Sequence, residues 1–132
     1  MKKSVDTQAL RKATEGLLFP SETDAPLEVF EWPDEQGKPD KVRVLELAKL
    51  PAGTPVKTKS VDAFFKDVTQ EQSWHDDQEK AEVQKFKQLV QTLKDSLADL
   101  KVFQAGKAES DVYLVGRTEA GWAGVKTKVV QT

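Results

Sequence analysis

The strongest constraint in the sequence is a helical repeat of apolar residues in its second half. The stripe consists of Phe86, Leu89, Val90, Leu93, Leu97 and Leu100. An α-helix brings residues three and four positions apart onto one face, so this spacing predicts an amphipathic helix over about residues 77–99. The apolar face of such a helix has to pack on another apolar surface, which the rest of the chain must provide.

Two further helices are expected before this one. Val5, Ala9 and Ala13 recur at helical spacing and predict a first helix over about residues 5–17, with Ser4 or Asp6 as its cap. The segment "VDAFFKD" follows Ser60 and has apolar residues at spacings that suit a short helix over 61–67.

The remaining apolar segments have the character of β-strands. Residues 27–32 ("LEVFEW") and 41–47 ("KVRVLEL") predict two strands, antiparallel across the polar turn 33–40. Three more candidates lie at 101–106, 111–118 and 122–131, with a turn at 119–124. This order predicts one α+β domain over residues 1–132, with a mixed or antiparallel sheet covered by helices.

Composition excludes several classes of protein. The chain has 132 residues, the size of one domain, and it contains no cysteine, so a disulfide framework is excluded. The N-terminus lacks the apolar segment of a signal peptide, and no apolar run reaches membrane-spanning length. We therefore expect a cytoplasmic protein. A net charge of −2 gives no general affinity for nucleic acid.

The charge is nevertheless uneven. Residues 20–40 carry seven acidic residues against Lys38 alone, and residues 67–82 carry six against Lys80 alone. Side by side in the fold, these segments would form a patch that attracts a basic partner. The alternative is two separate solvated faces, which is the commoner meaning of charge runs.

Catalytic signatures are missing from the sequence. His75 is the single histidine, whereas zinc sites need three or four converging ligands. There is no phosphate-binding loop and no nucleophile motif. A pair among the 22 acidic residues could do acid–base work, but such pairs arise by chance in so acidic a set. The sequence therefore favours a binding module over an enzyme.

Three features suggest presentation to a partner. The loop "PSETDAP" holds Glu22 between two prolines, which restrict the backbone, and Ser21 and Thr23 can bond to it locally. Trp74 is an aromatic residue in a polar stretch, and it is either an interface anchor or a staple at the start of the long helix. The last predicted strand runs almost to Thr132, which would hold the terminal carboxylate in a fixed place, unless the chain simply ends there.

Together these features resemble the sugar-non-specific nuclease inhibitor family, the NuiA-like proteins of bacteria. The resemblance covers most of the chain and is vague only over residues 33–59. The matching stretches are "GLLFPSETDAPLEVFEW", "VDAFF" through Trp74, "KAEVQKFKQLVQTLKDSL" and "DVYLVGRTEAGWAGVKTKVVQT".

The resemblance implies a fold and a function. The fold would be a three-layer α/β/α sandwich around a mainly antiparallel sheet. The function would be inhibition of a Mg²⁺-dependent endonuclease that cuts DNA and RNA, in a one-to-one complex, by a protein that is a monomer when free. The resemblance implies no cofactor, no metal site of its own, and no direct binding to nucleic acid or membrane.

The resemblance also assigns roles to residues. Glu22 would enter the nuclease cleft with its neighbours Ser21, Thr23 and Asp24, Thr132 would approach the nuclease's Mg²⁺, and Trp74 would lie in the interface. Two alternatives remain open. One is an interaction module with a non-nuclease partner. The other is a small-molecule-binding or enzymatic domain, which would need a deep pocket with converging polar groups.

Overall fold

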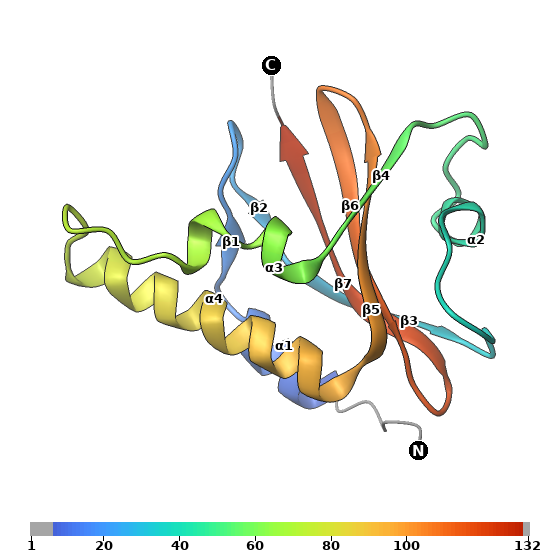
Figure 1. Cartoon of the computed structure of the whole chain (residues 1–132), viewed down its shortest axis with the longest axis horizontal. Coiled ribbons are helices and arrows are strands. Elements are labelled where there is room, and N and C mark those ends of the chain that lie inside the picture. The colour runs from blue at the N-terminus through green and yellow to red at the C-terminus, as the bar shows by residue number, and fades with distance from the viewer. Residues whose placement is uncertain (1–6, 131–132) are drawn as a thin grey trace.

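A computed structural model describes residues 7–130, in which helices surround one five-stranded sheet (Figure 1). The helices are α1 (Thr7–Thr14), α2 (Lys41–Leu47), α3 (Val61–Phe64), the 3-10 turn η1 (Asp67–Thr69) and α4 (Asp77–Ser96). The strands are β1 (Leu18–Phe19), β2 (Ala25–Pro26), β3 (Glu28–Pro33), β4 (Val56–Lys59), β5 (Ala98–Gly106), β6 (Glu109–Arg117) and β7 (Gly121–Val130).

The large sheet has the strand order β3-β7-β6-β5-β4, and each neighbouring pair is antiparallel. Strands β5, β6 and β7 form a meander joined by tight turns, which confirms the three strands predicted near the C-terminus. Strands β1 and β2 form a separate two-stranded hairpin. The α+β class with an antiparallel sheet is therefore confirmed.

Helix α4 is the long helix that the apolar stripe predicted. The Asp76 carboxylate accepts the Glu79 N–H at 2.8 Å, and the Glu79 side chain accepts the Asp76 N–H at 3.3 Å, so the helix begins with a reciprocal capping box. Phe86, Leu89 and Leu93 of the stripe are buried. The apolar spacing of the sequence thus fixed both the existence and the buried face of this helix.

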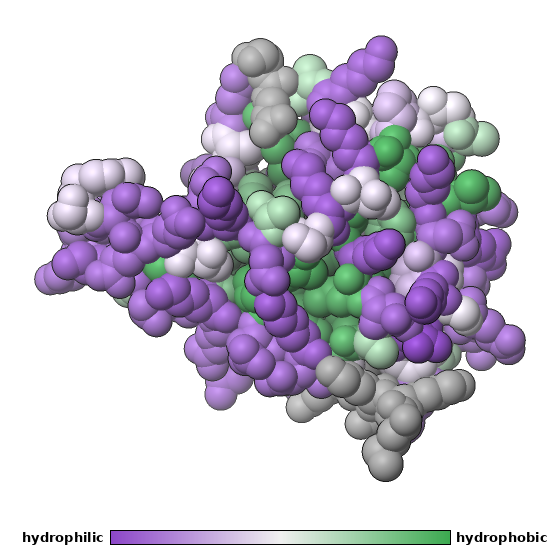
Figure 2. Space-filling view, viewed as in Figure 1, coloured by the Kyte–Doolittle hydropathy of each residue, from purple (hydrophilic) through white to green (hydrophobic). Residues whose placement is uncertain are grey.

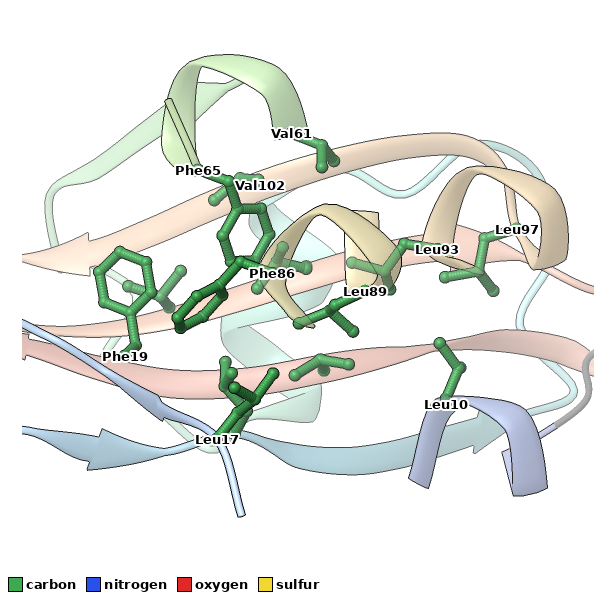
Figure 3. Close-up of a cluster of buried hydrophobic side chains, with 14 of the residues drawn as sticks. Leu10, Leu17, Phe19, Val61, Phe65, Phe86, Leu89, Leu93, Leu97 and Val102 are labelled. Atoms are coloured by element: carbon green, nitrogen blue, oxygen red, sulfur yellow. The ribbon is translucent and has the colours of Figure 1, made fainter. Parts of the chain in front are cut away.

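The main core lies between the first face of the sheet and the helices α1, α3 and α4. Figure 3 shows Leu10 of α1, Phe65 beside α3 and the leucines of α4 in front of the strands, and all of them are buried. Leu17 and Phe19 enter the same cluster from the segment around β1. In Figure 2 hydrophobic residues gather near the centre of this view and are bordered by hydrophilic ones.

The second face of the sheet carries a smaller cluster. Its buried members are Val44, Phe103, Val115 and Trp122, and Val44 belongs to α2. Figure 1 places α2 on the side of the sheet away from α4. Within residues 7–130, helical cover on the second face consists of the seven-residue helix α2. The full α/β/α sandwich therefore stays a prediction.

One predicted strand is wrong. Residues 41–47 form the helix α2, because Asp40 caps it by accepting the Arg43 N–H at 3.0 Å. The Glu35 carboxylate then binds Arg43 in a two-point pair at 2.6 and 2.8 Å. The alternation of polar and apolar residues over Lys41–Val44 suits a strand, but two adjacent buried residues, Val44 and Leu45, suit a short helix as well.

Because residues 41–47 do not form a strand, β3 has a different partner from the one predicted. Instead of a local hairpin, β3 pairs with β7, with Glu28 opposite Lys126 and Trp32 opposite Trp122. The strands β1, β2 and β4 were not predicted. The first helix ends at Thr14, before the predicted end at about residue 17, and its proposed caps Ser4 and Asp6 lie outside the described residues.

The centre of the sheet gives a prediction at Gly124. This residue lies between Phe30 of β3 and Val115 of β6, and a Cβ placed there would overlap the Leu114 carbonyl oxygen. We expect Gly124→Ala to lower the free energy of unfolding by about 3 kcal/mol or more, because the backbone of β6 would have to move. Urea unfolding would measure it.

Gly53→Ala is the control for this variant, since a Cβ at Gly53 has no atom within 4 Å. The control should unfold like the wild type. Equal stability of both variants would contradict the close approach of β6 and β7.

The Glu35–Arg43 pair predicts a dependence of stability on pH. The hydrogen bond from Arg43 lowers the pKa of the Glu35 carboxyl below its usual value. A group with a lowered pKa stabilises the fold above its unfolded pKa, about 4.3, and this contribution is lost as pH falls through the folded pKa. We therefore expect Glu35→Gln to be less stable than wild type at pH 7 and to approach it as the pH falls below the folded pKa of Glu35.

Urea unfolding of both proteins at several pH values would measure this convergence. Glu82→Gln, an exposed change on α4, is the control. A stability difference that stays constant from pH 7 to pH 3 would show that the ionised pair does not contribute.

Candidate functional site

The loop at residues 20–24 is the turn of the β1–β2 hairpin. Leu18 pairs with Pro26 and Phe19 pairs with Ala25, so the two ends of the loop are held together. Phe19 and Ala25 are buried, whereas Glu22, Thr23 and Asp24 are exposed. The hairpin therefore fixes the base of the loop in the core and leaves its carboxylates in solvent.

Aromatic contacts hold the base of this loop. The ring of Phe19 stacks on that of Phe64 with centroids 4.5 Å apart and an interplanar angle of 11°. The same ring meets Phe65 and Phe86 edge-on at 5.9 and 6.4 Å. These contacts join β1 to α3 and α4, so the loop projects from a packed base.

Hydrogen bonds join the tip of the loop to the end of β7. The Val130 N–H donates to the Ser21 Oγ at 3.1 Å, and the Glu22 N–H donates to the Val130 carbonyl at 3.1 Å. The Ser21 hydroxyl in turn donates to the Thr23 carbonyl at 2.7 Å. Ser21 therefore makes the local bonds expected of it, and it also connects two segments 109 residues apart.

This junction bears on Thr132, the other residue assigned to the inhibitory site. Thr132 lies outside the described residues, and Val130 is the last residue that the structure describes. Because Val130 bonds directly to the loop, the strand that leads to Thr132 ends beside Glu22. The Glu22 loop and the described end of β7 thus share one end of the molecule.

Trp74 comes from a different segment. It lies before α4, whose N-terminal end projects to the far left in Figure 1, whereas the β1–β2 hairpin points upward. Its side chain is 72% exposed and meets the His75 ring edge-on at 4.3 Å. So high an exposure disfavours the staple alternative, because a staple residue is covered by the helix it packs on.

A groove of about 500 Å³ adjoins the loop. Its lining includes Glu22 from the loop, Phe64 of α3 and Asp67 of η1, and Gln104 and Val129 contribute from the sheet. Asp67 belongs to the second acidic run of the sequence, so the fold brings at least one member of each run to the same groove. Sequence reasoning did not predict that Phe64 and Gln104 line a groove, because residues from α3 and β5 meet there only through tertiary packing.

A second hollow of about 560 Å³ lies at the opposite end of β7. It is lined by residues 34–37 and by the β6–β7 turn, with Arg117 among them. Arg117 pairs with Asp99, and Glu35 pairs with Arg43. Two of its four charged lining residues are thus engaged in ion pairs.

Residues 7–130 contain neither a candidate metal site nor a membrane-spanning helix. No group of three or more histidine or acidic side chains there is placed to hold a metal ion. No helix in that range is both long and apolar enough to cross a membrane.

Comparison with protein families decides the relationship. The family of nuclease A inhibitor-like proteins (NuiA) matches residues 5–132, which is nearly the whole chain. The chain belongs to the NuiA family. A search of curated proteins found no significant match. The NuiA match confirms the resemblance drawn from the loop, the long helix and the C-terminal strands.

The junction between the loop and β7 gives a prediction for Ser21→Ala. The variant loses the acceptor of the Val130 N–H and the donor to Thr23, so the amide of Val130 should exchange faster with solvent. The free energy of unfolding should fall by only about 1 kcal/mol, because other bonds of the hairpin remain. Amide hydrogen exchange followed by NMR would measure both effects.

Ser73→Ala is a matched control, since Ser73 is exposed on the loop before α4. It should leave the Val130 amide unchanged. Unchanged exchange at Val130 in the Ser21 variant would contradict the junction.

Proposed function

We propose that this protein inhibits a non-specific DNA/RNA endonuclease by blocking its Mg²⁺-containing active site. Membership of the NuiA family supports an inhibitor of a nuclease. The observation that carries the mechanism is the exposed Glu22 on a hairpin tied to the end of β7. In the proposed complex, one inhibitor monomer binds one nuclease.

The chemistry follows from what a nuclease cleft binds. Such a cleft holds a phosphate near Mg²⁺ and cationic side chains. The Glu22 carboxylate would take the place of the phosphate and accept charge-assisted hydrogen bonds. Oxygen atoms of Thr132 would suit Mg²⁺, which is a hard cation. A carboxylate offers no bond for the enzyme to cleave, so the nuclease would be blocked and not turned over.

The shape of the loop supports tight binding. Its base is packed against Phe64 and its tip is bonded to Val130. A loop already held in one shape loses little conformational entropy on binding. Ser21 would act by holding this shape, and the exposed Thr23 and Asp24 would lie in the surrounding interface.

Trp74 would form a second contact. An exposed tryptophan is a common anchor in protein interfaces because it buries a large apolar area with few rotatable bonds. Its distance from the hairpin along the surface would require a nuclease face broad enough to meet both. The acidic residues near both segments would speed association with a basic nuclease face.

The direct test is degradation of plasmid DNA and of RNA by a Mg²⁺-dependent non-specific endonuclease from the same organism, with this protein titrated in. We expect a sharp loss of both activities at about one equivalent. A folded protein that leaves that enzyme fully active would overturn the proposal. Capture of a partner without nuclease activity would then favour an interaction module of the same fold.

Glu22→Ala tests the mechanism. Removing the carboxylate should weaken inhibition by about 2–5 kcal/mol, because cationic groups of the nuclease would stay buried without a partner. Inhibition constants from the nuclease assay measure the loss. Deletion of Thr132 should also reduce potency.

The control is Glu119→Ala, which makes the same change in the exposed β6–β7 turn. Strand β7 separates this turn from the loop by about 30 Å. Full potency in both the Glu22 variant and the Thr132 deletion would show that the mechanism is wrong even if the protein inhibits.

A further inference from the structure

The groove beside the Glu22 loop is lined in part by apolar side chains. Phe64, Val68 and Val129 line it, and Val129 is 4% exposed. These residues come from α3, η1 and β7, so the groove is formed by tertiary packing and not by one loop. Apolar walls of this kind accommodate the methylene stem of a long side chain.

One polar group in the groove has unused hydrogen-bonding capacity. The Gln104 side chain is 7% exposed, and its amide nitrogen donates to the Ser110 Oγ at 3.3 Å. Ser110 donates onward to the Lys107 carbonyl, which orients the pair. Within residues 7–130 the Gln104 Oε1 has no hydrogen-bond partner, and this oxygen is not completely enclosed by protein atoms. It is an acceptor available to a donor that enters the groove.

The charges around the groove favour a cation. Its lining includes the carboxylates of Glu22 and Asp67, while Lys59 is the one basic residue in the lining. The lining therefore has an excess of one negative charge. An incoming group that donates several hydrogen bonds and carries positive charge matches both Asp67 and the Gln104 oxygen.

We propose that this groove receives an arginine side chain from the rim of the nuclease active site. The inference rests on the proposed function and adds a second contact beside the one made by Glu22. The arginine stem packs on Phe64 and Val68, and its guanidinium donates to the Asp67 carboxylate and to the Gln104 Oε1. Arginine fits better than lysine, because its planar group offers five donors in a fixed geometry.

Lys59 sets the selectivity of this groove. Its ammonium group opposes an incoming cation, so it weakens binding of any nuclease that presents an arginine here. It would favour a nuclease whose rim also carries an acidic residue near that arginine. The groove would therefore distinguish between nucleases that share the same catalytic site.

The first experiment tests the groove without a nuclease. Arginine amide is titrated into the isotope-labelled protein and followed by NMR, with citrulline amide as the uncharged control. We expect saturable shifts of the Gln104 side-chain amide and the Val68 and Val129 methyl groups with arginine amide only. Equal responses to both compounds, or no response, would overturn the proposal.

The second experiment uses the nuclease assay. Asp67→Asn should weaken inhibition on the order of tenfold, because a hydrogen bond to a charged group is lost. Lys59→Gln should strengthen it. Asp62→Asn is the matched control, since the exposed Asp62 on α3 pairs with Lys94 of α4 and does not line the groove.

The outcomes separate the two proposals. If the wild type inhibits while Asp67→Asn and Asp62→Asn behave alike, the groove inference is wrong and the proposed function stands. If the wild type fails to inhibit, the proposed function is wrong, and the arginine titration alone decides whether the groove binds a guanidinium group.

Discussion

Strand β7 holds the parts of this protein together through backbone hydrogen bonds on both of its edges. It pairs with β3 on one side and β6 on the other, and its last described residue bonds to the loop at Ser21 and Glu22. A shift of one residue in this pairing would exchange the two faces of the strand. It would move Ala123 and Val125 out of the main core and displace the attachment point of the loop. Stability and the proposed site thus depend on one register.

The division of the sheet into two unequal faces follows from the helices that cover it. Helix α4 brings a long apolar stripe to the first face, so the larger cluster forms there and also buries the base of the β1–β2 hairpin. The second face has the short helix α2, held by Asp40 and by the Glu35–Arg43 pair. The proposed binding elements therefore project from the better-packed side, where little motion of their base is expected.

The elements that sequence reasoning predicted well share a long, regular pattern. The stripe of α4 spans several turns, and the three C-terminal strands are nine or ten residues long and rich in apolar residues. Patterns of this length are seldom compatible with a different secondary structure. Short elements were predicted poorly. Residues 41–47 became a helix because one cap at Asp40 decided between two compatible patterns. The two-residue strands β1 and β2 have no periodicity to detect.

The candidate site could likewise be predicted only in part from the sequence. Its family and the proline-bounded loop of Glu22 were accessible from residue types and their local context, because prolines and motif stretches are features of neighbouring positions. For Trp74 the sequence left an interface anchor and a helix staple open, and only the structure showed that it is exposed. The sequence did not predict the hydrogen bond between Ser21 and Val130. Nor did it predict the groove that brings Asp67 and Gln104 together. They join residues far apart along the chain, and no local pattern encodes such contacts. The sequence by itself determined the helix, the long strands and the family, whereas only the tertiary structure decided which segments meet, since strand pairing and packing select among many locally equivalent arrangements.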